Sequence, residues 1–293
     1  MIDFKKITLQ DATQLNKILR NTDDLTCEIS FVNQLVWQSL YNNRFCLKDG
    51  ILYLKSYSEN AVTYSLPFGD IKTGMKQIAD DAGEPFPIIW AQAGSRFEEF
   101  KKLYGDYYDI FESRNEFDYI YNSSDLINLS GKKYHSKRNH ISAFSKQFDW
   151  HYEDINENNI KAVKKAAELW YNQNSERMDE ELKTEKQGVF MILDNMKTLD
   201  VNGGAIVIDK NVIAFSLGSP INDLVYDIHI EKALEDYDTA YTVINREFAE
   251  RNAKYKYINR EDDLGLEGLR RSKLSYHPEI LLPKYICTKK ENI

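Results

Sequence analysis

The chain has 293 residues and a formal net charge of −8, with 42% hydrophobic and 29% charged residues. This is the composition of a globular protein, and the length favours two domains over one. The acidic balance argues against a general binder of nucleic acids or anionic membranes, because such proteins need a surplus of lysine and arginine.

The sequence indicates a cytoplasmic location for the protein. Its three cysteines, Cys27, Cys46 and Cys287, are far apart and lack a C-x-x-C pattern, so neither a disulfide framework nor a zinc site is expected. The five histidines form no ligand motif, and we predict no metal. We recognise no signal peptide, and no apolar run approaches the roughly 20 residues that a membrane span requires.

The first half predicts helices and strands in alternation. Apolar residues recur at helical spacing over residues 11–20, 31–41, 71–82 and 96–104. Alternating apolar residues flank Lys48-Asp49-Gly50, and Asp-Gly in that setting is typical of a β-hairpin. Further strands are expected over residues 61–66 and 87–91 and near Tyr119.

The second half predicts a similar order. Helices are expected over residues 161–173 and 185–197, followed by a hairpin that joins 204–208 to 212–217. A strand over 224–230, a helix over 237–252, a strand over 255–259 and a short helix over 266–276 complete it.

This repeated order predicts two copies of one mixed α/β unit. A polar break near residues 122–130 marks the boundary. We therefore expect an N-terminal domain of residues 1–125 and a C-terminal domain of residues 126–293 that carries the site.

A lysine lies on the apolar side of a predicted basic helix over residues 131–148. Lys137 falls on the stripe that includes Ile141 and Phe144, and Arg138 borders that stripe. The ammonium group either reaches water while the methylenes are buried, or it faces a cleft.

The short helix after Gly265 repeats this feature. Lys273 lies on the side that carries Leu266 and Leu269, with Arg270 at its border. Two inward lysines indicate a cleft for a carboxylate, phosphate or oxyanion. Buried ion pairs are the alternative, because an unpaired buried ammonium is costly.

Strand alternation places Asp227 and His229 on one face, with Glu231 continuing that face. An aspartate and a histidine that point the same way could serve proton transfer. Asp227 suits an orienting or ammonium-binding role better than that of a strong base. A solvated sheet face is the alternative.

The stretch NREDDLGLEGLRRSK, residues 259–273, is the most informative in the chain. Its strand ends in a polar cluster before Gly265 permits a sharp turn into a helix. Ligands of open α/β sheets bind at such turns, although helix capping by Asp263 is the structural alternative. The polar cluster comprises Asn259, Arg260, Glu261, Asp262 and Asp263.

Three segments carry a family resemblance: GKKYHSKRNH (131–140), DIHIEKA (227–233) and NREDDLGLEGLRRSK (259–273). They resemble a bacterial family grouped with the C-terminal domain of phosphatidylglycerol lysyltransferases, over nearly the whole chain. The resemblance implies a mixed α/β tandem GNAT-like acyl-CoA N-acyltransferase fold, with two similar domains that each hold a mixed sheet flanked by helices. More distant relatives of this fold pass an amino acid from tRNA to a lipid hydroxyl or a peptide amine.

The sequence departs from the related families in two respects. The membrane-spanning portion of lipid lysyltransferases is missing, which argues against a lipid acceptor. GNAT acetyltransferases hold the coenzyme pyrophosphate with a glycine-containing loop, whereas the corresponding junction here, EKALEDYDTA, has four acidic residues and no glycine. Acetyl-CoA is therefore not expected in the C-terminal half.

We expect an acyltransferase that moves an aminoacyl group from aminoacyl-tRNA to an amine or hydroxyl of a small molecule, a peptide or a lipid head group. No cofactor is expected beside this donor. Two alternatives stay open: an acetyl-CoA-dependent N-acetyltransferase that uses the first half, and a non-catalytic protein that binds a small molecule or peptide. The expected catalytic residues are Asp227, His229 and Lys273, and the expected substrate-binding residues are Lys137, Arg138, Asn259, Arg260, Asp263 and Arg270.

Overall fold

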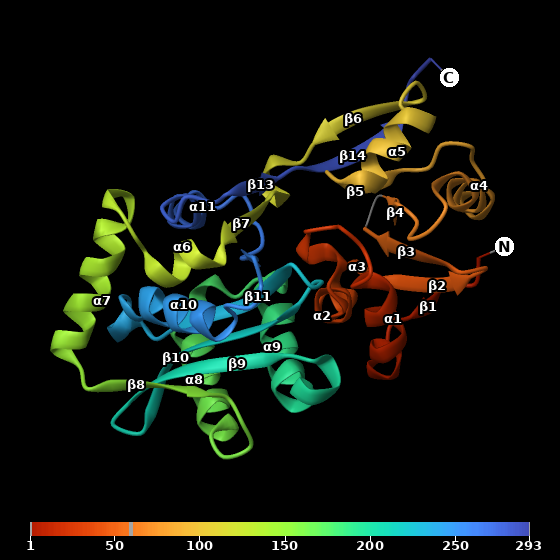
Figure 1. Ribbon diagram of the computed structural model, residues 1–293. Coiled ribbons are helices and arrows are strands. Elements are labelled where there is room, and N and C mark those ends of the chain that lie inside the picture. Colours follow the sequence, from red (N-terminus) through yellow and green to blue (C-terminus); the bar gives the residue numbers. More distant parts are fainter. Residues whose placement is uncertain (1, 59–60, 293) are drawn as a thin grey trace.

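Two seven-stranded sheets form the frame of the computed structural model, which describes residues 2–58 and 61–292 (Figure 1). The first sheet has the spatial order β1 (Lys5–Lys6), β2 (Arg44–Lys48), β3 (Ile51–Tyr57), β4 (Val62–Ser65), β5 (Ile89–Gln92), β14 (Lys284–Lys289) and β6 (Tyr108–Glu112). The second sheet has the order β8 (Trp150–Asp154), β9 (Asn202–Ile208), β10 (Asn211–Pro220), β11 (Val225–Ala233), β12 (Tyr257–Asn259), β7 (Asp118–Asn122) and β13 (Ile280–Leu282).

The two sheets have the same topology. Each contains one parallel pair, β4 with β5 or β11 with β12. The remaining neighbours in each sheet are antiparallel. The prediction of two copies of one mixed α/β unit is thus confirmed.

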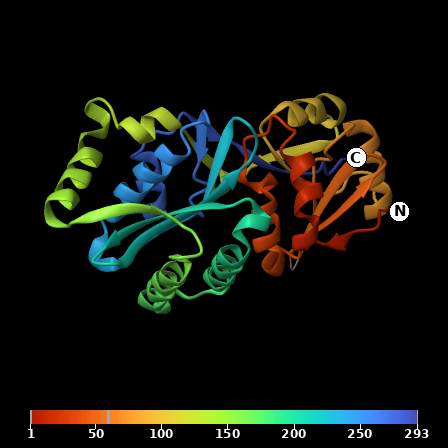
Figure 2. The ribbon, with the colours of Figure 1, turned by 60° about the horizontal axis from the view of Figure 1, so that its bottom comes forward.

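The halves exchange one strand each. The strand β14, at the end of the chain, lies between β5 and β6 of the first sheet, while β7 lies between β12 and β13 of the second. Figure 2 shows the dark blue C-terminal segment passing from one half to the other. The sheets therefore do not divide at residue 125, because β7 precedes that residue and belongs to the second sheet.

Local sequence sets the bounds of the elements. The first hairpin turns through Asp49 and Gly50, both with positive φ, as the tight turn predicted between β2 and β3 requires. Asp70 begins α4 by accepting a hydrogen bond from the Thr73 amide at 2.7 Å, and Gly83 ends it at a φ of 72°. The helix expected over residues 31–41 is instead broken at Trp37.

The helices cover both faces of the sheets. The first half contains α1 (Ala12–Leu19), α2 (Phe31–Val36), α3 (Gln38–Tyr41), α4 (Ile71–Ala82) and α5 (Ser95–Tyr104). The rest of the chain contributes α6 (Ser123–Asn128), α7 (His135–Gln147), α8 (Ile160–Gln173), α9 (Glu180–Leu199), α10 (Ala240–Arg251) and α11 (Glu267–Leu274). None of the helices in the described ranges is both long and apolar enough to cross a membrane.

One hydrophobic core spans both halves. It joins Phe31 and Val32 of α2 to Val189 and Ile192 of α9 and to the facing side of the second sheet. The approach of the helices is close, because a Cβ atom on Gly188 would lie 2.4 Å from a Val36 methyl group. The polar groups described next lie where the first half meets this sheet.

Candidate functional site

The parallel strands β11 and β12 part after a short contact. They pair only from Val225 opposite Tyr257 to Asp227 opposite Asn259. Beyond this point β11 continues alongside β10, whereas the chain after Asn259 turns away. The side chains predicted as functional gather around this parting of the strands.

A β-bulge determines which way these side chains point. Leu217 of β10 pairs with Ile230, and the next residue, Gly218, pairs with Ile228, so His229 is an extra residue in β11. A Cβ atom on Gly218 would lie 2.3 Å from the Asp227 carbonyl oxygen, so this close approach requires glycine.

Because of the bulge, the residues after His229 do not follow the strand alternation that the sequence predicts. Asp227 and His229 share a face, as predicted, and their side chains approach to 3.3 Å. Glu231 was expected on that face, but it lies beyond the bulge on the other side, where it contacts Arg260 and Asn245. The parting of the strands therefore has polar groups on both sides of the sheet.

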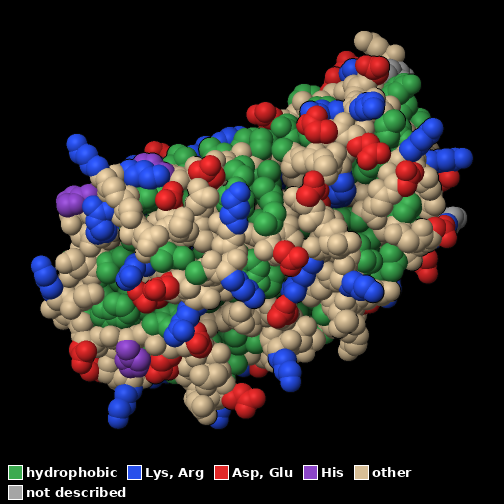
Figure 3. Space-filling model, viewed as in Figure 1, with side chains coloured by type: hydrophobic (Ala, Val, Ile, Leu, Met, Phe, Trp, Pro, Cys, Tyr) green, Lys and Arg blue, Asp and Glu red, His purple; other side chains and the backbone are tan. Residues whose placement is uncertain are grey.

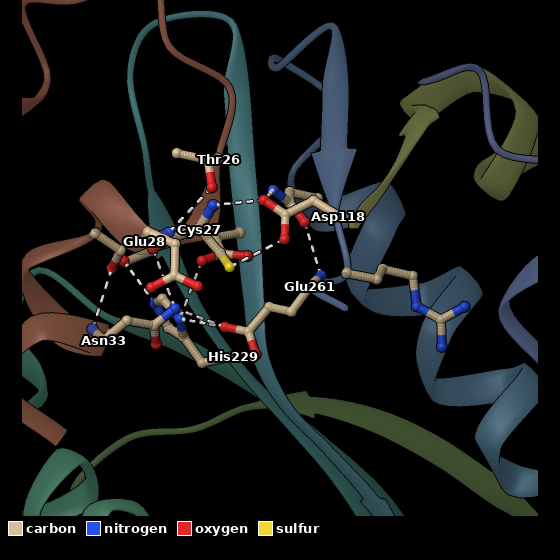
Figure 4. A network of polar contacts seen from close by, with 12 residues as sticks. Thr26, Cys27, Glu28, Asn33, Asp118, His229 and Glu261 are labelled. Carbon is tan, nitrogen blue, oxygen red and sulfur yellow. Dashed lines mark hydrogen bonds and ion pairs between the residues drawn. The ribbon is translucent and has the colours of Figure 1, made fainter. Parts of the chain in front are cut away.

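On the first side, Asp227, His229 and Glu261 form what we call the carboxylate cluster. The Nδ1 atom of His229 lies 3.3 Å from an Asp227 oxygen and 3.4 Å from a Glu261 oxygen. Its Nε2 atom lies 2.8 Å from the Ser219 hydroxyl. Asn33 of α2 donates a hydrogen bond to Glu261 at 2.8 Å, so the first half helps to hold the cluster (Figure 4).

Burial and charge set the protonation of the cluster. Burial raises the pKa of Asp227 to about 7, although the neighbouring imidazolium opposes this. Burial also opposes the charged form of His229, but Asp227 and Glu261 outweigh it and raise the histidine pKa to about 9. At neutral pH the imidazole is thus the cation of the cluster.

Two features indicate that the cluster can take a further cation. Both carboxylate oxygens of Asp227 are buried and accept no well-oriented hydrogen bond from a residue in the described ranges, while the charged ring of His229 lies 3.3 Å from one of them. The ligand atoms of the three side chains all lie within 4.8 Å of one another. This spacing could hold a metal ion or an ammonium group.

A second buried layer lies next to the cluster. Lys284 contacts Asp118 at 2.8 Å and Glu28 at 3.1 Å, and the Cys27 thiol donates to Asp118 at 3.2 Å. Asn259 donates to Asp118 at 3.0 Å and accepts from the Glu261 amide at 2.7 Å. Asn259 therefore links this layer to the cluster, and so does Asn33, which donates to the Cys27 carbonyl oxygen at 3.2 Å as well as to Glu261. Figure 4 shows Cys27, Asp118, Asn33 and Glu261 in this network.

The sequence prediction missed Glu28, Asn33, Asp118, Ser219 and Lys284. A signal existed for two of them, because Asp118 interrupts the apolar run FDYIY and Lys284 interrupts LLPKYI. A charged residue inside an apolar strand is rarely buried without a partner. The pairing itself was not visible, since it depends on the exchanged strands.

On the second side, Arg260 and Lys137 lie around Tyr276. Arg260 donates to Glu231 at 2.6 Å, and its guanidinium carbon is 4.8 Å from the centre of the Tyr276 ring. The Lys137 ammonium is 3.8 Å from the same ring centre. Burial, and then the charge of Arg260, lower the pKa of Lys137 to about 8.

Of the other predicted residues, Lys273 and Arg138 bind backbone carbonyl oxygens, and Asp263 pairs with Arg270. Lys273 donates hydrogen bonds to the carbonyl oxygens of Arg260 and Asp262 and so fixes the loop after β12. Asp263 accepts from Tyr119 at 2.5 Å and from two nitrogens of Arg270 at 2.8 Å. Arg138 is exposed and donates to the carbonyl oxygens of Leu129 and Gly131.

The predicted residues therefore occupy separate places. Asp227 and His229 lie in the carboxylate cluster, and Asn259 lies in the adjacent buried layer, between Asp118 and the Glu261 amide. Lys137 and Arg260 lie together on the opposite side of the sheet. Cavities of about 620 and 710 Å³ lie elsewhere, beside Phe68 and beside Tyr152, and none of the cluster's residues lines either one.

Comparison with known proteins gives the family of this architecture. The model of the family described as "Phosphatidylglycerol lysyltransferase, C-terminal" matches residues 20–288. A protein of Mycoplasmoides gallisepticum is 27% identical over 200 residues, which are 66% of this chain and 62% of that protein. The chain thus spans less than two thirds of the length of this relative.

Solved structures of other proteins have the same fold as this chain. A conserved protein of unknown function from Bacteroides thetaiotaomicron is 34% identical and superimposes with a TM-score of 0.92, covering 99% of this chain and 100% of its own. The L-PGS structure from Bacillus licheniformis has a TM-score of 0.64 at 15% identity, over 96% and 92% of the two chains. A tandem GNAT protein from the clavulanic acid biosynthesis pathway has a TM-score of 0.50 at 8% identity, over 98% of each chain. The chain belongs to the phosphatidylglycerol lysyltransferase C-terminal family and has a tandem GNAT fold.

Proposed function

We propose that this protein is an aminoacyltransferase that takes the aminoacyl group from aminoacyl-tRNA and passes it to an amine or hydroxyl acceptor. The observation that carries the proposal is the carboxylate cluster, where Asp227 is fully buried and accepts no well-oriented hydrogen bond from the described residues, its oxygen lying 3.3 Å from the His229 ring. A cationic amino group satisfies such oxygens. Every aminoacyl ester with a free α-amino group carries one.

The family supports the kind of reaction. Its description names a lysyltransferase, which moves an aminoacyl group. The carboxylate cluster lies at the carboxyl end of the parallel pair β11–β12, the edge at which ligands of α/β sheets gather. An acyl transfer at this place needs a group that handles protons, and His229 is there.

In the proposed reaction, the acceptor's nitrogen or oxygen bonds to the carbonyl carbon of the ester, and the bond to the ribose oxygen breaks. An ammonium group bound by Asp227 and Glu261 would lower the pKa of His229 from about 9 through like-charge repulsion. The imidazole can then accept the acceptor's proton and return it to the leaving ribose oxygen. Lys273 positions the loop that carries Glu261.

An RNA donor would have to bind by local contacts. Acidic and basic side chains are interspersed on the face shown in Figure 3, with no single basic surface. The exposed residues Lys254, Lys256 and Arg271 are the proposed contacts for the acceptor end. Because aminoacyl-tRNA is a cytosolic substrate, we place the protein in the cytoplasm.

The test is transfer of label from a pool of radiolabelled aminoacyl-tRNAs to peptides, amino compounds and extracted lipids. We expect transfer by the wild type, at least about a hundredfold loss in Asp227→Asn, and full activity in Asp223→Asn, an exposed aspartate just before β11. Binding of aminoacyl-tRNA without transfer would instead support a non-catalytic binding protein.

The alternative that acetyl-CoA is the acyl donor can be tested by a separate measurement. We propose that acetyl-CoA is not the donor in the C-terminal half, because the chain between β11 and α10 carries Glu235, Asp236 and Asp238 and no glycine. Acetyl-CoA should leave the melting temperature unchanged. A rise in the melting temperature that depends on acetyl-CoA concentration would favour the alternative of an N-acetyltransferase that uses the first half.

A further inference from the structure

The three side chains of the carboxylate cluster have the spacing of metal ligands. The Nδ1 atom of His229 lies 3.3 Å from an Asp227 oxygen and 3.4 Å from a Glu261 oxygen. Two atoms that bind one zinc ion at about 2.0–2.1 Å and at tetrahedral angles are about 3.3–3.4 Å apart. The imidazole nitrogen is therefore placed to share a metal ion with both carboxylates.

The burial of Asp227 is independent evidence for a cation at this place. Its side chain is 0% exposed, and neither oxygen accepts a well-oriented hydrogen bond from the residues that the structure describes. Buried carboxylates are normally paired or bound to a metal. The approach of the His229 ring to one oxygen leaves the other without a hydrogen-bond partner in the described ranges.

Outer contacts hold the other two groups of the cluster. The Nε2 atom of His229 lies 2.8 Å from the Ser219 hydroxyl, which leaves Nδ1 directed toward the carboxylates. Asn33 donates to Glu261 at 2.8 Å. Metal ligands commonly have such outer partners, which fix the orientation of the ring and of the carboxylate. The Glu261 side chain is 23% exposed, so an ion can enter past it.

The types of ligand indicate the class of metal. Three protein ligands, with a fourth position for water, are the arrangement of open zinc sites. Calcium and magnesium prefer oxygen ligands, and calcium takes about six to eight of them. One imidazole nitrogen with two carboxylates therefore suits a divalent transition metal of the zinc class better.

The ligands come from two separate segments. Asp227 and His229 belong to β11, whereas Glu261 follows β12, and the two strands part directly beyond Asp227 and Asn259. The sequence prediction of no metal considered motifs among neighbouring residues. A site whose ligands meet only where two strands part has no such motif.

We propose that Asp227, His229 and Glu261 bind a divalent metal ion of the zinc class, and that this ion and the amino group of the aminoacyl ester exclude each other. The metal bonds to Nδ1 and to one oxygen of each carboxylate, while the imidazolium proton leaves to water. The two carboxylates then balance the charge of the metal. The ion is a reversible inhibitor of transfer. Mutual exclusion rests on the proposed function, whereas metal binding rests on the geometry alone.

Metal binding can be measured on protein that has been treated with a chelator. Calorimetry with zinc chloride should show one zinc ion per chain in the wild type, and magnesium chloride should not displace it. His229→Gln should weaken zinc binding by more than about a hundredfold, because loss of an outer partner alone costs about 10- to 100-fold. His140→Gln, which changes an exposed histidine of α7, should bind zinc as the wild type does. Equal affinity of wild type and His229→Gln would overturn the proposal.

A second measurement uses the wild type and does not depend on the folding of a variant. In NMR spectra of protein labelled in its histidine rings, one equivalent of zinc should shift the resonances of His229 and leave those of His140 in place. Shifts confined to exposed histidines would show adventitious surface binding and would overturn the proposal.

Competition with an amino-acid amide separates this proposal from the proposed function. At free zinc concentrations fixed by a metal buffer, the apparent affinity of the wild type for the amide should fall as zinc rises. If zinc binds and leaves the affinity for the amide unchanged, the mutual exclusion is wrong. If zinc binds to a protein that neither binds an amide nor transfers an aminoacyl group, the proposed function alone is contradicted.

Discussion

Lys284 and Asp118 form a 2.8 Å ion pair in which neither side chain is exposed. The lysine lies on β14 of the first sheet and the aspartate on β7 of the second, so the pair joins the two exchanged strands. Burial opposes the lysine's charge, but Asp118, Cys27 and Glu28 together raise its pKa well above the usual value. The ammonium therefore stays charged inside the protein.

This pair predicts a strong coupling between the halves. Asp118→Asn should lower the free energy of unfolding by about 3–5 kcal/mol, because it leaves a buried ammonium without its main partner. The double variant Asp118→Asn with Lys284→Met should lose less than the sum of the single variants. Urea denaturation of the four proteins gives the coupling energy, and strictly additive losses would contradict the assignment.

His229 should stay protonated at neutral pH. Its folded pKa of about 9 lies above the ordinary 6.5, so its contribution to stability is complete below pH 6.5 and is lost as pH rises through 9. The imidazole resonances in an NMR titration should change near pH 9. The stability difference between wild type and His229→Gln should shrink between pH 7 and 9, and a midpoint near pH 6.5 would refute this protonation.

Two consecutive aspartates, Asp262 and Asp263, should differ strongly in their response to the same substitution. Burial alone would raise the pKa of Asp263, but hydrogen bonds from Arg270 and Tyr119 hold it well below its usual value. Burial raises the pKa of Asp262 to about 7. At neutral pH, Asp263→Asn should lower the free energy of unfolding by about 2–4 kcal/mol, and Asp262→Asn should change it by less than about 1 kcal/mol.

The Asp263 contribution should also depend on pH. Because its folded pKa is lowered, the stabilisation is present above the ordinary value of 3.8 and is lost as pH falls below it. Thermal unfolding of wild type and Asp263→Asn at several pH values measures this. Melting temperatures that differ by the same amount at neutral and strongly acidic pH would be inconsistent with the ion pair.

Lys273 should act through the loop that it holds. Lys273→Met leaves the carbonyl oxygens of Arg260 and Asp262 without their buried donor, at a cost of about 1–3 kcal/mol. We expect a lower melting temperature together with reduced aminoacyl transfer. A variant as stable as the wild type but inactive would instead assign the ammonium a direct part in the reaction.

Local patterns were sufficient to predict most elements of the fold. The hairpins β2–β3 and β9–β10 follow from alternation around a turn, and α4 follows from its apolar stripe between Asp70 and Gly83. These features depend on neighbours in the sequence. The exchange of β7 and β14 depends on contacts between distant segments, and no local pattern encodes it.

Part of the site could likewise be predicted, because it depends on residues that are neighbours in the sequence. Strand alternation brought Asp227 and His229 to one face, but the bulge at His229 reversed the direction of Glu231, because an extra residue shifts every later side chain. Lys284 and Asn33 reach the site only through the meeting of the two halves. The inward position predicted for Lys273 agrees with its burial, and its partners there are backbone carbonyls.

The central claim is that the carboxylate cluster binds the amino group of an aminoacyl ester. Equilibrium binding of a panel of amino-acid amides, which keep the amino group and replace the ester by a stable amide, tests it most directly. We predict that the wild type binds at least one amide, that N-acetylation of its α-amino group abolishes binding, and that Asp227→Asn weakens it by about tenfold or more while Asp223→Asn does not. Equal binding of the free and N-acetylated amides, or an unchanged affinity in Asp227→Asn, would contradict the account.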